Sequence, residues 1–282
     1  MVRIITDSAA DFEPQELTQK QISCIPLTVM FGNAEYQENV NLSKNEFYTH
    51  LLESEHIPKT AQASPQILMD LFEDAHQHDD DAIYITLSSA LSGTYQSAAM
   101  IQASLGYENC YVIDSKNATG GQRLVVEYAV KLRDEGKTAA EILAGIESLR
   151  SRITLHACMD TMEYLYKGGR ISHTAYKLGT LANIKPIIAV DDEGFVQVPA
   201  KAMGMRKGMD YMCKHSDLNV LDPEFPLYVM YTNNRTVAET LAARLATIGH
   251  DIPDEHIIQV GAAIGSHIGP NACGLVYVRN QA

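Results

Sequence analysis

Hydroxyl side chains and a glycine gather within Ser88–Thr94, directly after a short apolar run. That run, Ala82–Leu87, has the apolar and β-branched residues of a buried strand, and Tyr95–Leu105 has helical spacing. A strand, a polar turn and a helix start favour an anion site, because the first amides of a helix lack internal partners and the helix dipole attracts negative charge. Ser92 could donate its hydroxyl to an anion, and Gly93 lets a ligand approach the backbone. The residues alone leave an alternative equally open, in which Ser92 only caps the helix.

Three further residues could contribute to such a site. Thr60 offers a hydroxyl from a polar segment without periodicity, which predicts a loop. Arg170 follows a glycine pair that ends a helical turn, and its planar guanidinium suits a carboxylate or a phosphate. His267 stands in the glycine-rich segment Gly261–Gly274, which predicts a loop that approaches a ligand closely. Simpler explanations exist: an exposed loop hydroxyl for Thr60, and a contact with its own helix end for Arg170.

Metal and nucleotide sites are not expected. His76, His78 and the aspartates after them stand in a charge run at a predicted helix end, which is typical of a solvated surface. The five cysteines are scattered without a Cys-x-x-Cys pair, and several lie in apolar runs, so we expect free thiols. The segment around His267 matches neither G-x-G-x-x-G nor G-x-S-x-G, and the chain has no P-loop. We therefore expect no metal and no cofactor.

The charge and composition exclude several classes of partner. The 282 residues carry a formal net charge of −13, which disfavours nucleic acid and anionic membrane surfaces. An anionic ligand therefore needs a local positive site. The sequence begins without the apolar core of a signal peptide, and no apolar run approaches the ~20 residues of a membrane span. These patterns predict a cytoplasmic protein with no stable membrane insertion.

The first half of the chain alternates between strands and helices. Val2–Ile5 and Cys110–Ile113 predict further buried strands, and capping boxes at Ser43–Glu46 and Thr138–Glu141 begin helices. This alternation favours a largely parallel sheet with helices on both faces. Ile22–Phe31 contains a proline and predicts one edge or bulged strand.

The second half departs from this pattern. Lys185–Val190 and Phe195–Pro199 flank an Asp-Asp-Glu-Gly turn, which predicts a β-hairpin. We predict an N-terminal α/β domain over residues 1–152 and a C-terminal domain over residues 153–282. Four methionines between Met203 and Met212 are typical of a core, although methionine also suits a pocket for a flexible alkyl chain.

Six segments follow one another along nearly the whole chain in a family-like order. They are Ile5–Ser8, Lys59–Gln62, Ser88–Ala98, Tyr164–Ser172 (Tyr-Leu-Tyr-Lys-Gly-Gly-Arg-Ile-Ser), Lys185–Ile187 and Ile264–Pro270. Each segment is weak alone, but the ordered set is specific. The chain resembles the DegV family of bacterial fatty-acid-binding proteins.

The resemblance implies a fold and a ligand. The fold is a two-domain DegV-like α/β fold, with a mostly parallel α/β/α sheet in the N-terminal domain and a mixed sheet in the C-terminal domain, which covers the ligand tail. A long-chain fatty acid would lie between the domains, its carboxylate held by Thr60, Ser92 and the backbone of Gly93, with Arg170 and His267 nearby. A tail of about C14–C18 suits such burial, because each buried methylene contributes roughly 0.8 kcal/mol.

Two positions depart from the family pattern. Ala61 and Ala63 stand where the family usually has serine and proline. The missing hydroxyl at Ala61 is expected to weaken or alter one polar contact. Thr60 and Ser92 remain, so the binding prediction stands.

The resemblance also implies a partner. Members that act as kinase subunits hand the bound acid to a separate ATP-dependent fatty acid kinase, which makes the acyl phosphate. We therefore expect a lipid-binding carrier of phospholipid metabolism that is not itself an enzyme. Arg206 and Lys207 form a local positive pair that could dock the kinase, and solvated helix charges explain this pair equally well.

Two other functions remain open. A serine-dependent acyl hydrolase or phosphotransferase would use Ser92 and His267, although no third orienting residue can be named. A carrier for another anionic amphiphile, such as an acyl phosphate or an isoprenoid acid, needs the same kind of cavity. Turnover of acyl esters that Ser92→Ala abolishes would distinguish the enzyme from the carriers.

Overall fold

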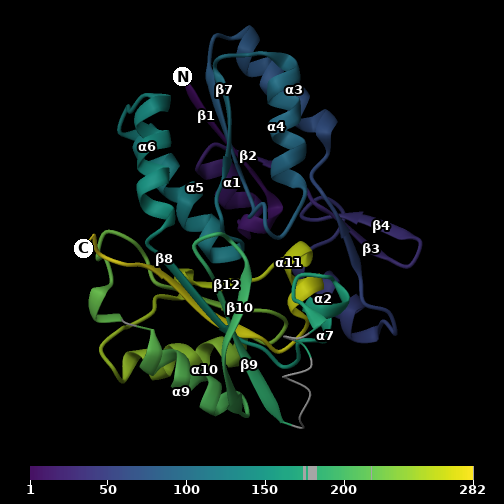
Figure 1. The fold of residues 1–282 in the computed structure, drawn as a ribbon, viewed down its shortest axis with the longest axis vertical. Helices are drawn as coiled ribbons and strands as arrows, with labels where there is room; N and C mark the ends of the chain where they lie inside the picture. The colour runs from purple at the N-terminus through teal and green to yellow at the C-terminus, as the bar shows by residue number, and fades with distance from the viewer. Residues whose placement is uncertain (174–175, 177–182, 217, 282) are drawn as a thin grey trace.

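The computed structural model describes residues 1–173, 176, 183–216 and 218–281. Within these residues the strands form sheets of four, six and three strands. Figure 1 shows the four-stranded sheet in the upper half of the molecule, the six-stranded sheet below it and the small sheet to one side.

The four-stranded sheet is parallel throughout. Its order is β2-β1-β6-β7, formed by β1 (Val2–Asp7), β2 (Ile22–Ile25), β6 (Asp81–Thr86) and β7 (Cys110–Asp114). The inner strands are almost wholly buried, as expected of a parallel sheet covered on both faces. The covering helices are α3 (Pro65–Gln77) and α4 (Thr94–Leu105) on one side, and α5 (Thr119–Asp134) and α6 (Ala139–Arg150) on the other (Figure 1). The predicted α/β class is confirmed.

The six-stranded sheet is mixed. Its order is β10-β9-β8-β13-β11-β12, formed by β8 (Ile153–Cys158), β9 (Ile184–Val190), β10 (Val196–Met203), β11 (Tyr228–Tyr231), β12 (Ile257–Gln259) and β13 (Cys273–Val278). Only β11 and β12 pair in parallel among these described strands. Helices α9 (Met205–His215) and α10 (Arg235–Ala246) pack against the sheet. The antiparallel pairing of β9 with β10 confirms the predicted hairpin.

The small sheet packs against a short helix near the C-terminal end of the chain. Its antiparallel strands are β3 (Thr28–Phe31), β4 (Ala34–Gln37) and β5 (Lys59–Ala61), in the order β4-β3-β5. Helix α11 (Ala262–Ile268) packs against β3, β5, α2 (Lys44–Glu53) and α7 (Glu163–Lys167). The remaining helical elements are α1 (Pro14–Gln19), η1 (Ser8–Ala10), η2 (Leu218–Val220) and η3 (Asp254–His256).

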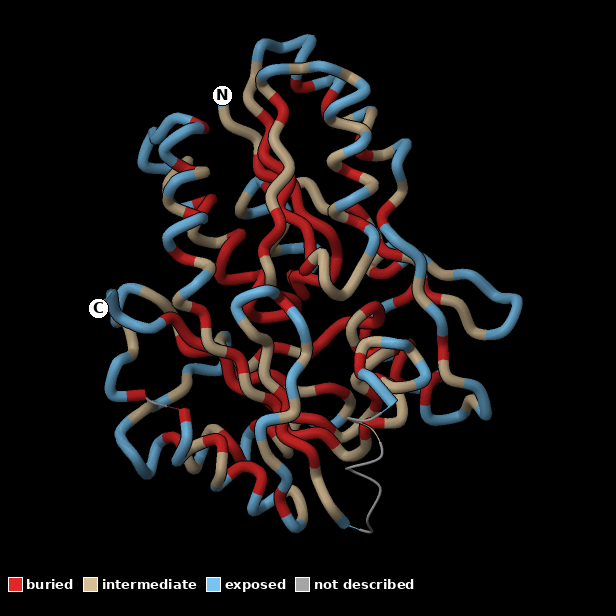
Figure 2. Tube along the Cα trace, viewed as in Figure 1, coloured by how far each residue is buried: buried red, intermediate tan, exposed pale blue. Residues whose placement is uncertain are grey.

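A common hydrophobic core joins the two large sheets. Side chains of α5 and α6 pack in one cluster with residues of β1 and β6 and also with residues of β8, β11 and β13. Helix α5 comes so close to the mixed sheet that a Cβ on Gly120 would lie 2.6 Å from Val276. Figure 2 shows buried segments of the chain in both halves of the molecule and in the region between them. The predicted boundary at residues 152 and 153 falls between α6 and β8, and its standing as a domain boundary stays a prediction.

Three local predictions are wrong. Ile22–Phe31 is two strands in different sheets, because Pro26 stands where β2 ends and the chain turns towards β3. The segment around Thr60 is not a loop but the edge strand β5, whose partner β3 supplies the hydrogen bonds. Gly261–Gly274 is not a continuous loop, since it contains α11 and the start of β13.

Other predictions concern side chains and membrane spans. All five cysteines are free thiols. No described group of three or more His, Cys, Asp and Glu side chains is placed to hold a metal ion. Across the described ranges, every helix is too short or too polar to cross a membrane.

Candidate ligand-binding site

An apolar cavity of about 400 Å³ lies where the turns that follow two strands of the parallel sheet meet strands of the mixed sheet and of the small sheet. Its wall includes residues of β5, of the turns after β6 and β7, of β8 to β10, and of α7 and α11. The larger apolar side chains that line it are Leu27, Leu87, Leu91, Leu155, Leu165, Ile188, Val190, Val196, Ile264 and Ile268. A cavity of this volume and lining suits an elongated apolar molecule.

The five residues predicted to bind a ligand all line this cavity. Thr60, Ser92, Gly93, Arg170 and His267 come from four separate segments of the chain, and the fold brings them together. They make one part of a mainly apolar wall polar. Their contact with a ligand stays a prediction.

Ser92 serves the helix start and the cavity wall together. Its Oγ accepts a hydrogen bond from the backbone amide of Thr94 at 3.2 Å and lies 2.9 Å from the Thr94 hydroxyl. The N-cap of α4 is Gly93 and not Ser92, so Ser92 supports the helix start only through this bond to its first amide, and it also lines the cavity. At Gly93, a Cβ would lie 3.0 Å from Oε1 of Gln62, so the missing side chain leaves room for that neighbour.

His267 is hydrogen bonded to Thr60. The distance from His267 Nε2 to Thr60 Oγ1 is 2.9 Å, across 207 residues of sequence. Burial, assisted by the Arg170 charge, lowers the pKa of His267 to about 4, so its imidazole is neutral at pH 7. The other ring nitrogen, Nδ1, is buried without a hydrogen-bond partner among the described residues. A Cβ on Gly168 would lie 2.2 Å from this nitrogen, so the glycine makes room for the ring.

Arg170 brings a positive charge to the same wall. Its Nε donates to the carbonyl of Leu91 at 3.0 Å, and its guanidinium also donates to the carbonyl of Gly168. None of the described ion pairs gives it a carboxylate partner, and burial lowers its pKa. A half-buried guanidinium held by two carbonyls is placed to attract an anion.

A second cavity of about 760 Å³ adjoins the first, and we call it the polar cavity because its mixed wall is more polar than that of the first. Thr60, Arg170 and His267 line both cavities, so the polar end of the apolar cavity faces this second space. Lys59 and Lys167 add positive charge to the wall of the second cavity, and Glu55 adds negative charge. A ligand whose head group lies at the shared wall is therefore accessible from the second cavity.

Sequence reasoning missed two polar residues of the wall. Gln62 lies two residues after Thr60 and presents an amide to the cavity. Thr119 begins α5 with a φ of +48°, and its hydroxyl donates to the Asp11 carboxylate. Position in the polar Lys59–Gln62 segment could have identified Gln62, whereas no local pattern indicates Thr119.

The methionines and the positive pair of α9 lie away from the cavity. Met209 and Met212 are buried in the core between α9, α10 and the mixed sheet, which confirms the core interpretation for these two, whereas Met203 at the end of β10 is 55% exposed. Arg206 and Lys207 are exposed on α9, and no residue of α9 lines either cavity. Their role in docking stays a prediction.

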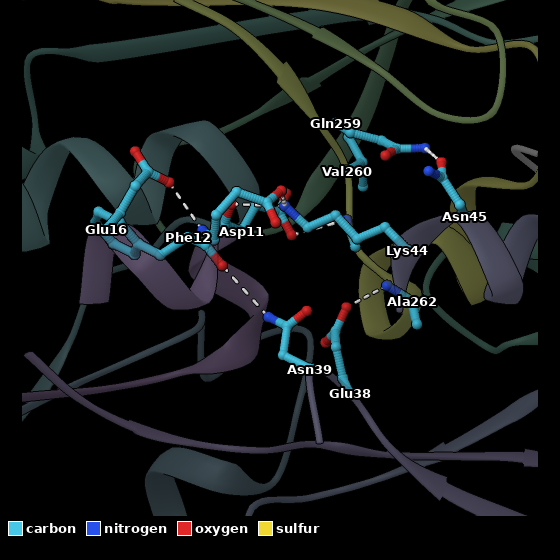
Figure 3. A network of polar contacts seen from close by, with 12 residues as sticks. Asp11, Phe12, Glu16, Glu38, Asn39, Lys44, Asn45, Gln259, Val260 and Ala262 are labelled. Carbon is cyan, nitrogen blue, oxygen red and sulfur yellow. Dashed lines mark hydrogen bonds and ion pairs between the residues drawn. The ribbon is translucent and has the colours of Figure 1, made fainter. Parts of the chain in front are cut away.

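A buried polar network supports the helix that carries His267. Figure 3 shows Glu38 pointing at the first turn of α11 and Lys44 reaching towards Asp11. Burial raises the pKa of Glu38 to about 7 and that of Asp11 to about 6. The negative charge of Asp11 adds to the shift at Glu38.

The described geometry does not contain the hydrogen bond of a serine nucleophile. Such a serine would donate to the histidine that activates it. Here His267 Nε2 is bonded to Thr60, and the Ser92 hydroxyl lies against Thr94. This arrangement favours binding over nucleophilic catalysis.

Comparisons with known proteins agree with this fold. The family model described as an uncharacterised protein of the DegV family matches residues 1–280. A DegV domain-containing protein of Caldanaerobacter subterraneus is 33% identical over 282 residues, covering 98% of each chain. A DegV family protein from Thermus thermophilus, whose structure is described as showing fatty acid binding, is 26% identical, with a TM-score of 0.89 over 99% of each chain. DegV of Bacillus subtilis, described as a fatty acid binding protein, is 26% identical, with a TM-score of 0.83 over 99% of each chain. The chain therefore belongs to the DegV family.

Proposed function

We propose that this protein binds a long-chain fatty acid and presents its carboxylate to a separate ATP-dependent fatty acid kinase. The observation that carries the proposal is an apolar cavity of about 400 Å³ whose wall is polar and positively charged at Thr60, Ser92, Arg170 and His267. The fatty acid binding described for the proteins from Thermus thermophilus and Bacillus subtilis supports it.

The apolar wall supports the choice of a long alkyl tail. Each methylene that leaves water contributes roughly 0.8 kcal/mol, so a tail of about C14–C18 gains enough to offset the immobilisation of its bonds. Burial of the carboxylate end is favourable only if donors replace its water. The proposal assigns these donors to Thr60, Ser92, the Gly93 amide and Arg170.

Because His267 is neutral, its tautomer decides whether the Thr60 hydroxyl can donate a hydrogen bond to the ligand. A carboxylate only accepts hydrogen bonds. It therefore selects the tautomer in which His267 Nε2 carries the proton and donates to Thr60 Oγ1, which leaves the Thr60 hydroxyl hydrogen for the ligand. In this proposal His267 acts through Thr60, and Arg170 supplies the charge.

The adjoining polar cavity supports presentation to a partner. Because Thr60, Arg170 and His267 line both cavities, a carboxylate at this wall is open to a phosphoryl donor held by another protein. The proposal assigns phosphoryl transfer to that kinase and a non-catalytic carrier role to this chain. Arg206 and Lys207, exposed on α9, are its proposed docking residues.

Calorimetric titration of the delipidated protein tests the ligand. Palmitate is expected to bind at one per chain and at least about tenfold more tightly than methyl palmitate, whose ester lacks the charge that Arg170 attracts. Equal affinities would contradict the assigned carboxylate site. The double variant Arg206→Glu/Lys207→Glu tests the docking residues: it should impair acyl phosphate formation with the kinase and leave palmitate binding unchanged.

A further inference from the structure

Helix α11 is short for the number of cavity-lining residues that it carries. It has only seven residues, yet Ala263, Ile264, His267 and Ile268 all line the apolar cavity. So short a helix is not stable alone, because the cost of forming its first turn is recovered only over many residues. No side chain of its own caps its N-terminus. Contacts from elsewhere must therefore set the position of His267.

Two buried carboxylates bind the first amides of this helix. Asp11 Oδ1 accepts from the Gly261 amide at 2.9 Å. Glu38 Oε1 accepts from the Ala262 amide and, at 3.3 Å, from the Ala263 amide. In Figure 3 both carboxylate side chains belong to the N-terminal part of the chain, whereas α11 belongs to the C-terminal part. Negative charge is favourable at this end of a helix, where the amides have no internal partners.

The far oxygens of both carboxylates are anchored in turn. Glu38 Oε2 accepts from the Ser8 hydroxyl at 2.6 Å, and Asp11 Oδ2 accepts from the Thr119 hydroxyl. Both carboxylate side chains are only 1% exposed. Helix α11 is thus tied to η1 and to the start of α5, which are buried helical elements packed on the N-terminal sheet.

Close packing leaves α11 little freedom around these bonds. A Cβ on Gly261 would lie 2.1 Å from Glu38 Oε1. A Cβ on Gly265 would lie 2.7 Å from the ring of Phe47 and from the hydroxyl of Tyr48. Lys44 Nζ, which donates to the Asp11 carbonyl at 2.9 Å and to Glu13 at 2.7 Å, brings a compensating charge near the two carboxylates.

We propose that Glu38 and Asp11 are positioning residues that hold the first turn of α11, so that His267 in its last turn meets Thr60 at the carboxylate end of the cavity. This inference rests on the proposed function for its effect on affinity. Its effect on the His267 ring is independent of any ligand. Neither carboxylate lines either of these two cavities: Glu38 acts through α11, whereas Asp11 also accepts from Thr119, which lines the apolar cavity.

The test compares Glu38→Ala, Glu38→Asp and Glu38→Gln with Leu241→Ala. Leu241 belongs to α10, is fully buried in the core and lines neither cavity, so its truncation destabilises the fold without touching α11. Two quantities are measured: the His267 pKa by nitrogen NMR of labelled histidines, with His267→Gln identifying the signal, and the dissociation constant of palmitate.

Glu38→Ala is expected to release α11 and expose the imidazole, so the His267 pKa should rise from about 4 by about one unit or more. Palmitate binding should weaken about tenfold. Glu38→Gln should restore most of both quantities, because its amide oxygen still accepts from the Ala262 amide. Leu241→Ala should lower stability and change neither quantity.

One set of results would contradict the inference. If the alanine variant loses stability as Leu241→Ala does but keeps the wild-type His267 pKa and palmitate affinity, Glu38 only stabilises the fold and the inference is wrong. If that variant does not fold, Glu38→Asp, which draws the carboxylate back by one methylene, decides the question with the same two measurements. If the wild-type protein binds no palmitate, the proposed function fails, and the titration of His267 still tests the positioning role.

Discussion

His267 Nε2 lies 2.9 Å from Thr60 Oγ1, and this hydrogen bond joins the last turn of α11 to the edge strand β5. Its two residues line both the apolar and the polar cavity. The hydrogen bond therefore lies at the junction of the two cavities, where the tail of a bound amphiphile would meet its head group. Four predictions follow from the groups around it.

Thr60→Val keeps the shape of the side chain and removes its hydroxyl. A hydrogen bond to a charged group contributes about 1.5–3 kcal/mol, so palmitate affinity should fall roughly tenfold to a hundredfold. Methyl palmitate affinity should change much less. Calorimetry on both ligands measures this, and an equal loss for acid and ester would show that Thr60 does not hold the carboxylate.

Arg170→Gln removes the half-buried charge and keeps a hydrogen-bonding side chain. Palmitate binding should weaken about tenfold or more, because no described carboxylate shares the guanidinium and its full attraction acts on the ligand. The matched control is Arg152→Gln, since Arg152 is paired with Asp222 away from both cavities. Unchanged palmitate affinity in Arg170→Gln would show that Arg170 does not bind the carboxylate.

Gly168→Ala should disturb the site chiefly through His267. The φ of Gly168 is −75°, which alanine adopts freely, but its Cβ would come within 2.2 Å of His267 Nδ1. We expect palmitate affinity to fall at least about fivefold. In a His267→Ala background the clash with the ring disappears and the 2.9 Å approach of the Cβ to the Tyr164 carbonyl oxygen remains, so adding Gly168→Ala should cost less affinity than it does in the wild-type protein. Additive losses in the double variant would contradict this explanation.

Stability should depend on pH through the buried carboxyls. Burial raises the pKa of Glu38 to about 7 and those of Asp11 and Asp7 to about 6, above the ordinary values for these groups. Between the ordinary and raised values the folded protein binds more protons than the unfolded chain. The free energy of unfolding therefore falls as pH rises from about 4 to about 7. His267, with its lowered pKa, opposes this trend, since its contribution is lost as pH falls from about 6.5 to about 4.

Glu38→Gln removes the titration of Glu38 and so isolates the contribution of this residue to the pH dependence of stability. Its unfolding free energy should fall less than that of the wild-type protein between pH 5 and pH 8, by on the order of 1–3 kcal/mol. Urea denaturation at a series of pH values measures the difference. Parallel profiles for the two proteins would show that Glu38 does not titrate in this range.

Local chemistry made much of the fold predictable. The capping box at Ser43 and Glu46 predicts a helix, and α2 begins at Lys44 with both bonds of the box present. The polar turn Asp191–Gly194 predicts the hairpin of β9 and β10. These signals lie within a few residues of the structure that they specify.

Helix α11 could not be predicted in this way. Its glycine-rich sequence favours a loop, and the partners that make it helical are Glu38 and Asp11, which lie 224 and 250 residues away in the sequence. Strand β5 is similar, since it exists because β3 offers an edge. The candidate site residues were found from their types and from the family resemblance, whereas Gln62, Thr119 and the carboxylates behind α11 required the tertiary structure.

The most direct measurement is native mass spectrometry of the purified protein, followed by solvent extraction and identification of the released molecule. We predict one long-chain fatty acid per chain, retained by the wild-type protein and lost from the double variant Thr60→Val/Arg170→Gln. A protein that is empty on purification and does not take up added fatty acid would contradict the account.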